Sequence, residues 1–171
     1  MDFFQVVRAR RSVRRFRPGE PVEPGDLEAI LEAARLAPSA KNLQPWCFVV
    51  VRDPDRKRAL ARAARRQWFV ADAGVVIVGL SDPGRSPRWH DRDLMIALEH
   101  MALAATALGY GSCWIGALDP EEVKRIVGAP GELEVVALLA IGVPAEEPPP
   151  RPRRPLSEIV FSEEYGRPWA P

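Results

Sequence analysis

The segment "DLMIALEHMALAATALG", residues 93–109, constrains the fold of this chain more than any other part of its sequence. It is long enough to form a helix and is apolar on nearly every side, so such a helix is buried on most of its faces. The whole chain has only 171 residues, which is typical of one domain. Because one sheet face in so small a domain cannot cover this helix, we expect a second copy of the chain to cover the rest, as a homodimer.

Apolar periodicity and helix-capping residues predict an alternation of helices and strands around this segment. Further helices are expected at residues 2–9, 25–36, 53–66 and 119–128. The last three of these helices are expected to have Asp26, Asp53 and Asp119 as their N-caps. The helix at residues 53–66 is expected to be exposed to solvent. Buried or short strands are expected at residues 46–52, 73–80, 112–118 and 133–143. This order predicts an α+β domain with a sheet covered by helices.

Composition and charge exclude several classes of protein. A net charge of +1 provides no general field toward nucleic acid or membrane. The N-terminus is too charged for a signal peptide, and no run reaches the roughly 18 apolar residues of a membrane helix. Cys47 and Cys113 have no metal-ligand or redox spacing and are expected to be buried thiols. We therefore expect a cytoplasmic protein with no metal, nucleic acid or membrane partner.

The C-terminal part is rich in proline and arginine. The stretch "GVPAEEPPPRPRRPL" carries six prolines from Pro144 to Pro155, which predicts an extended arm from about residue 144 and not a second domain. Residues 1–171 are thus expected to form a single domain with an arm. The prolines stiffen Arg151, Arg153 and Arg154, and pre-ordered cations suit the capture of an anion. A solubilising tail is the alternative.

A second basic cluster lies near the N-terminus. The stretch "RARRSVRRF", residues 8–16, places five arginines around Ser12. The guanidinium fork binds phosphate in a bidentate manner, and a serine adds a hydroxyl donor. A solvated helix end and a patch for nucleic acid are the alternatives. The second is disfavoured because no aromatic residues are interleaved with the arginines.

The stretch "APSAKNLQPW", residues 37–46, separates an expected helix from an expected strand. It holds Ser39, Asn42 and Gln44 between two prolines, and these neutral donors and acceptors suit the edge of a polar heterocycle. A plain loop is the alternative, in which Pro38 only stops the helix.

In "GYGSCWIGALD", residues 109–119, Gly116 either lets the backbone approach a flat ligand or serves a turn.

The common phosphate-binding and nucleophilic motifs are absent from the sequence. There is no G-x-G-x-x-G after a strand and no Walker loop. No Ser-His-Asp or Cys-His arrangement can be argued from the spacing. Arginines for a phosphate and amides for a ring edge, without a nucleophile, indicate a cofactor holder whose chemistry is that of the cofactor.

Four motifs follow one another along the chain: "RRSVRRF", "APSAKNLQPW", "LGYGSCWIG" after the long apolar segment, and "GVP…RPRRPLSEIV". In this order they resemble the motifs of the FMN-dependent nitroreductase family over essentially the whole chain. The resemblance implies a nitroreductase-like α+β fold, with a central, mostly antiparallel sheet flanked by helices. It also implies an intertwined homodimer with two FMN sites at the subunit interface. Members typically take hydride from NADH or NADPH onto FMN and reduce a small acceptor such as a nitroaromatic or a quinone.

The resemblance also assigns roles to individual residues. The phosphate, ribityl chain and pyrimidine end of FMN are assigned to Arg10, Arg11, Ser12 and Arg14. The other subunit contributes Pro38, Ser39, Ala40 and Asn42, with Gln44 ordering the loop. The remaining cofactor contacts are assigned to Gln67, Ile115 and Gly116 around the ring, and to Arg151, Arg153 or Arg154 at the phosphate. The substrate side is assigned to Trp68, Phe69 and Trp89, for which surface packing is the alternative.

Three departures from the family pattern affect what the resemblance implies. Many members have Ser where this chain has Ala40, and some have an acidic residue where Ile115 stands. The usual excursion over the flavin is trimmed to roughly "SDPGRSPRWHDRD", residues 81–93. One alternative function is specialised flavin chemistry, such as reductive dehalogenation or destruction of the flavin. Such chemistry usually needs added lid residues, which this short chain lacks. A non-catalytic FMN-binding regulatory protein is the other alternative.

Overall fold

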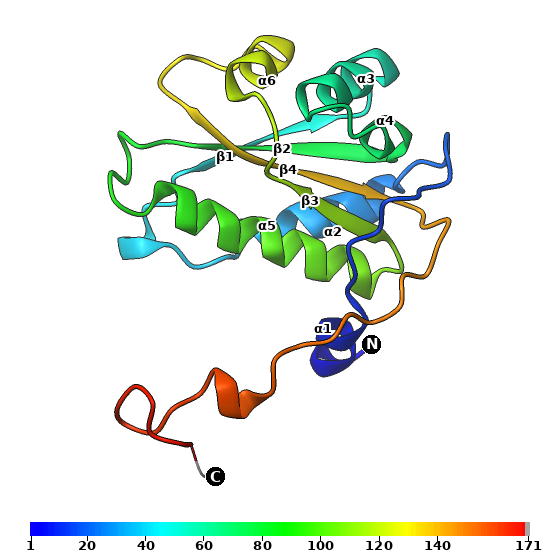
Figure 1. The fold of residues 1–171 in the computed structure, drawn as a ribbon. Helices are drawn as coiled ribbons and strands as arrows, with labels where there is room; N and C mark the ends of the chain where they lie inside the picture. The colour runs from blue at the N-terminus through cyan, green and yellow to red at the C-terminus, as the bar shows by residue number, and fades with distance from the viewer. Residues whose placement is uncertain (170–171) are drawn as a thin grey trace.

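The computed structural model describes residues 1–169 and consists of one sheet with helices on both faces (Figure 1). The helices are α1 (Phe3–Ala9), α2 (Pro24–Arg35), α3 (Pro54–Ala63), α4 (Phe69–Asp72), α5 (His90–Ala107) and α6 (Pro120–Val127). The strands are β1 (Trp46–Val51), β2 (Val75–Ser81), β3 (Gly111–Ile115) and β4 (Glu134–Gly142). Two short 3₁₀ helices, η1 (Ala40–Asn42) and η2 (Leu156–Glu158), complete the described elements.

The four strands form an antiparallel sheet in the order β1-β2-β4-β3. Helices α3, α4 and α6 cover one face, and α2 and α5 cover the other (Figure 1). Each face has its own cluster of buried apolar side chains, and the central strand β2 is buried along its whole length. The predicted α+β fold with an antiparallel sheet flanked by helices is therefore confirmed.

The predicted apolar helix is α5, which lies close against the sheet. An added Cβ at Gly79 of β2 would lie only 2.9 Å from Leu98 Cδ1, so glycine at this position permits the close approach. Leu94, Leu98 and Met101 are fully buried, yet Met95 remains 49% exposed and Ile96 39% exposed. One chain thus leaves an apolar side of α5 uncovered.

Two of the three predicted helix caps are confirmed. The carboxylates of Asp53 and Asp119 accept the backbone N–H groups of Arg56 and Glu122, with donor–acceptor distances of 2.8 and 3.0 Å. The prediction for Asp26 was wrong, because α2 begins earlier, at Pro24. Pro24 is a favourable first residue for a helix, which leaves Asp26 inside the first turn.

Two burial predictions were also wrong. Helix α3 is not simply solvated, because its Leu60 and Ala61 are buried in the apolar cluster on this face of the sheet and its Lys57 is buried as well. Burial lowers the pKa of Lys57, whose Nζ donates a hydrogen bond to the carbonyl of Ala73. Cys47 is exposed and not buried, because it lies on β1 at the edge of the sheet, where successive side chains alternate between faces.

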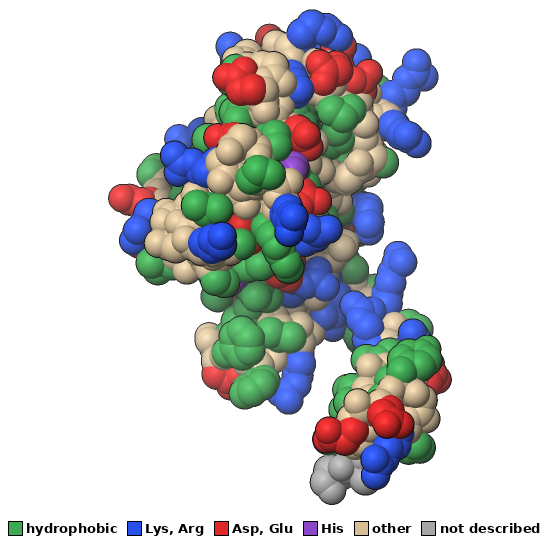
Figure 2. Space-filling view, turned by 90° about the vertical axis from the view of Figure 1, so that its left-hand side faces the viewer, with side chains coloured by type: hydrophobic (Ala, Val, Ile, Leu, Met, Phe, Trp, Pro, Cys, Tyr) green, Lys and Arg blue, Asp and Glu red, His purple; other side chains and the backbone are tan. Residues whose placement is uncertain are grey.

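The two ends of the described chain project from the body (Figure 1). Helix α1 exposes Phe3, Phe4 and Val7, and the segment that follows β4 exposes Leu156 and Ile159. Figure 2 shows hydrophobic side chains gathered on both projections. Within residues 1–169, no helix has the combination of length and apolarity needed to cross a bilayer.

Candidate functional site

The N-terminal arginine segment lies along the outer edge of β3. Ser12 pairs with Ser112 in a parallel bridge, and the N–H of Val13 donates to the carbonyl of Ser112 at 2.9 Å. An added Cβ at Gly111 would lie 2.8 Å from Val13 Cγ2, so the segment approaches the strand as closely as a glycine allows. This packing fixes the backbone from which the neighbouring arginines project.

The C-terminal segment returns beside the same residues. The N–H of Arg17 donates to Val143 O at 2.9 Å, and the N–H of Ala145 donates to Arg15 O at 2.8 Å. The N–H of Arg14 donates to Glu146 Oε1 at 2.8 Å. These contacts hold the start of the arm against the arginine segment.

A cavity of about 360 Å³ lies between the two segments. We call it the arginine cleft, and its basic and hydroxyl side chains are those of Arg10, Arg11, Ser12, Arg14, Arg151 and Arg153. Figure 2 shows basic side chains gathered between the body and the arm. The structure thus brings together six predicted cofactor residues from two segments that lie more than a hundred positions apart in sequence. Glu146 also lines the cleft and opposes the binding of an anion.

The cations of the cleft differ in how many hydrogen bonds they make within the protein. Arg10 Nε lies 3.8 Å from Glu99 Oε1, beyond hydrogen-bond distance. The guanidinium of Arg11 donates to Arg8 O at 2.5 Å and to Arg10 O at 2.9 Å, and that of Arg153 donates to Arg151 O at 3.2 Å. Arg154 lies outside the cleft lining, because it binds Glu158 in the arm at 3.0 Å.

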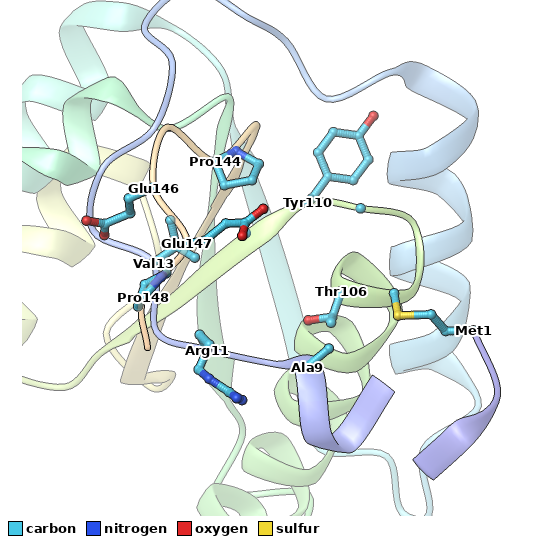
Figure 3. Close-up of a pocket in the computed structure, with 12 residues that line it drawn as sticks. Met1, Ala9, Arg11, Val13, Thr106, Tyr110, Pro144, Glu146, Glu147 and Pro148 are labelled. Atoms are coloured by element: carbon cyan, nitrogen blue, oxygen red, sulfur yellow. The ribbon is translucent and has the colours of Figure 1, made fainter. Parts of the chain in front are cut away.

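A second cavity, of about 400 Å³, adjoins the arginine cleft and shares Arg11, Glu146 and Pro148 with it (Figure 3). Figure 3 shows Glu147 turned toward Tyr110 and Glu146 turned to the opposite side. The hydroxyl of Tyr110 donates to Asp26 at 2.7 Å, so it is already satisfied. This cavity extends the hollow around the arginine cleft toward α5.

The end of β3 is open beside a glutamine. Ile115 is buried, whereas Gly116 is exposed and an added Cβ there would meet no atom within 4 Å. Gln67 Nε2 donates to Ala64 O at 3.0 Å and to Ala117 O at 3.4 Å, which places it next to Gly116. Trp68 is 52% exposed on the same turn. Phe69 is turned into the core, with its ring centroid 6.5 Å from that of Phe16.

Residues 38–45, which we call the polar loop, lie away from the arginine cleft. Figure 1 shows them beyond the N-terminal end of α5, whereas α1 and the start of the arm lie toward its other end. Lys41, Asn42 and Gln44 all have positive φ angles, of 52°, 56° and 49°. Such backbone costs about 1 kcal/mol or more for each non-glycine residue and often marks a functional site.

Hydrogen bonds within the polar loop hold this conformation. Ser39 Oγ accepts the N–H of Gln44 at 2.9 Å. Gln44 Nε2 donates to the carbonyl of Asn42 at 3.3 Å and to Asn42 Oδ1 at 3.1 Å. Pro38 is exposed, and Ser39 and Ala40 are half-buried.

Sequence reasoning missed one residue of this region, Asp93. Its side chain is 2% exposed, and both carboxylate oxygens face the N–H of Ala40, at 3.1 and 3.2 Å. The available signal was an acidic residue directly before the apolar run that begins at Leu94. Trp89 lies at the same end of α5, is 49% exposed, and has the guanidinium of Arg92 at 5.2 Å from its ring centroid.

The predicted site residues therefore fall into two groups within one chain. The arginine cleft, Gln67, Gly116 and Trp68 follow the β3 side of the molecule, and the polar loop and Trp89 lie at the start of α5. Burial raises the pKa of the Cys113 thiol, which disfavours a thiolate nucleophile there. Within residues 1–169, no three His, Cys, Asp or Glu side chains are grouped so as to hold a metal ion.

Comparisons with known proteins identify the family of this chain. A family model described as Nitroreductase family matches residues 7–83 and 65–143. An "NADH dehydrogenase" of Thermus thermophilus is 39% identical, over 94% of this chain and 96% of that protein. A "Putative NADH dehydrogenase/NAD(P)H nitroreductase" of Archaeoglobus fulgidus is 35% identical, over 85% of this chain and 87% of that protein.

Solved structures share the fold as well. The NADPH:FMN oxidoreductase of Vibrio harveyi, solved as a complex with NAD⁺, aligns with a TM-score of 0.89 and 25% identity. That alignment covers 98% of this chain and 79% of the other. With a family match over most of its length and relatives above 30% identity, this chain belongs to the nitroreductase family.

Proposed function

We propose that this protein, an NAD(P)H-dependent oxidoreductase of the nitroreductase family, binds FMN between two copies of the chain. We further propose that it passes electrons from NADH or NADPH to a small acceptor such as a nitroaromatic or a quinone. The observation that carries this proposal is the arginine cleft, which gathers cations from both ends of the sequence around one cavity. Two free cysteines are in keeping with a cytoplasmic location, which forms part of the proposal.

The side chains of the arginine cleft fit the phosphate of FMN. Five guanidinium groups and one hydroxyl line it, against one carboxylate, so the cleft favours an anion. The hydroxyl of Ser12 has no hydrogen-bond partner within residues 1–169, and Arg10 has only its long contact with Glu99. These groups are therefore free to bind phosphate oxygens.

The rest of FMN requires contacts that this cleft does not supply. The polar loop offers amide and hydroxyl groups for a ring edge but lies away from the cleft in the same chain. A second copy that placed its polar loop against the first copy's cleft would complete the site. The exposed apolar residues of α1, of α5 and of the arm support such a homodimer, because patches of this kind usually mark interfaces.

When bound, FMN supplies a ring nitrogen, N5, that takes up hydride. The chain's own contribution is binding and orientation. Arginines near the phosphate would fix one end of the cofactor, and a cation beside the pyrimidine end would favour its reduced anion. Gly116 leaves open space at the end of β3, and Gln67 is held beside it, so a flat ring can lie there without displacing a side chain. Trp68 on this side and Trp89 from the second copy are proposed to line the path of the donor and acceptor.

Specialised flavin chemistry is less well supported by the connection between β2 and α5. The residues from Asp82 to Trp89 form tight turns, and Ser86 among them is buried. So short a connection leaves few residues to form a lid over a bulky substrate. Reductive dehalogenation, flavin destruction and non-catalytic FMN storage therefore enter as alternative outcomes of the following test.

The test is a visible absorption spectrum of the purified protein with added FMN, followed by NADH and then NADPH under anaerobic conditions. Flavin absorption that either donor bleaches, with reoxidation by a quinone, is the expected result. A bound flavin that neither donor bleaches would favour a non-catalytic or specialised role. Failure to bind FMN at all would contradict the proposal.

A further inference from the structure

Asp93 differs from every other acidic residue of α5 in its burial. The side chain is 2% exposed, and its carboxylate belongs to the first turn of the helix. Within residues 1–169, the N–H of Ala40 is its one hydrogen-bond donor, shared between the two carboxylate oxygens. Burying a carboxylate with so few partners is costly, although the nearby helix N-terminus favours a negative charge. The residue therefore points to a role that depends on holding Ala40.

Ala40 is the position where the polar loop turns into its left-handed segment. The next two residues, Lys41 and Asn42, have positive φ angles, as does Gln44. Most other hydrogen bonds of the loop join its own residues, and two reach the connection before α5, where Leu43 O accepts from Arg85 Nη1 at 3.4 Å and Pro45 O accepts the N–H of Asp82. Among residues 1–169, Asp93 is the one residue of α5 that hydrogen-bonds to the polar loop, and α5 packs in the core against the sheet.

The same network settles which group Asn42 presents. Gln44 Nε2 donates to Asn42 Oδ1, so the oxygen of the Asn42 amide is occupied. An amide whose oxygen accepts in this way has its NH₂ group left as a donor. Asn42 is exposed, so that NH₂ group is available to an acceptor atom from outside the chain.

We propose that Asp93 is a positioning residue that anchors the polar loop through Ala40. Anchored in this way, the NH₂ group of Asn42 donates to an acceptor atom of the cofactor held by a second copy of the chain. The identity of that ligand rests on the function proposed above. The anchoring of Ala40 by Asp93 does not depend on that function, because both residues belong to the same chain.

The first experiment measures residue-resolved amide hydrogen exchange in the FMN-free protein. The N–H of Ala40 is expected to exchange at least about tenfold more slowly than that of Lys41, which makes no hydrogen bond within residues 1–169. In Asp93→Ala this protection is lost, whereas Asp93→Asn retains an oxygen acceptor and most of the protection. Asp91→Asn is the control on the same helical turn, where the carboxylate caps only the N–H of Arg92.

The second experiment measures FMN affinity by quenching of flavin fluorescence. Asp93→Ala is expected to weaken binding by about ten- to a hundredfold, and Asp93→Asn by about threefold or less. Equal loss in both variants, or no loss in either, would overturn the proposal. So would an Ala40 N–H that exchanges as fast as that of Lys41. If Asp93→Ala does not fold, the proposal is still tested by the exchange rates of the wild-type protein and by the exchange and FMN affinity of Asp93→Asn. Wild-type protein that binds no FMN would sink the proposed function and leave the exchange test of the anchor intact.

Discussion

The polar loop and the arginine cleft reach the same proposed ligand with different kinds of construction. In the polar loop, Ser39, Gln44 and Asp93 hold a strained backbone by hydrogen bonds of 2.9 to 3.1 Å. In the arginine cleft, Arg10 and Ser12 have almost no partners within residues 1–169, and packing of the two chain ends brings the cations together. A pre-organised loop selects a ligand by geometry, whereas loosely held cations attract one by charge.

The largest effect is expected from reversing a charge in the arginine cleft. Arg10→Glu replaces an attraction for phosphate by a repulsion and also faces Glu99, so FMN affinity is expected to fall by at least about a hundredfold. Titration of flavin fluorescence measures this. The matched control is Arg58→Glu on α3, where the native side chain pairs with Asp55 on the surface. Retained affinity in Arg10→Glu would count strongly against the phosphate assignment.

A smaller effect is expected from loosening the polar loop. Gln44→Ala removes the donor that orients Asn42, and loss of one such contact weakens FMN binding by about five- to tenfold. Because the lost contact is between neutral groups, the dependence of affinity on salt should stay as in the wild type. Arg10→Glu should lower that salt dependence. An equal change in salt dependence for both variants would erase the distinction between the two regions.

A gain of affinity is expected at the one acidic residue of the arginine cleft. Glu146→Gln removes a negative charge but keeps an oxygen to accept the N–H of Arg14, so FMN should bind about threefold more tightly. Glu147→Gln is the control, because this neighbour turns toward Tyr110 (Figure 3). Unchanged or weaker binding in Glu146→Gln would show that the cleft does not act through charge.

The smallest effect on binding is expected far from both regions, at Lys57. Its pKa is lowered by burial, so the unfolded chain binds this proton more tightly than the folded chain does. The stability associated with Lys57 is therefore complete above the ordinary lysine pKa and is lost as the pH falls through the lowered pKa. Urea unfolding at several pH values should show that the free energy of unfolding rises with pH in the wild type and not in Lys57→Met. The FMN affinity of the two proteins should be the same. Parallel pH profiles for the two proteins would contradict the assignment.

The sequence was sufficient to predict the fold because its local signals agree with one another. Asp53 and Asp119 precede prolines and cap the helices that they were expected to cap. The apolar segment that forms α5 retains an exposed apolar side in one chain, as its composition indicated. The prediction for Asp26 failed because Pro24, two residues earlier, starts the helix. The prediction for Cys47 failed because the place of a strand in the sheet depends on long-range pairing.

The site could be predicted only as a set of residues. Motif chemistry selected the arginines at both ends of the sequence, and the fold brings most of them to one cavity. Arg154 could not be separated from Arg151 and Arg153, because its pairing with Glu158 depends on how the arm folds. The left-handed backbone at Lys41 and Gln44 carries no glycine signal, and the contact between Asp93 and Ala40 joins residues far apart in sequence.

The central claim is that one complete site takes its arginine cleft from one copy and its polar loop from another. The most direct test co-expresses an Arg10→Glu chain and an Asn42→Ala/Gln44→Ala chain with different tags and isolates the mixed dimer. Each homodimer should bind FMN poorly at both sites. The mixed dimer should bind about one FMN per dimer with nearly wild-type affinity, because one of its two sites is assembled from intact regions only. A mixed dimer that binds no better than either homodimer would show that both regions of a site belong to the same chain.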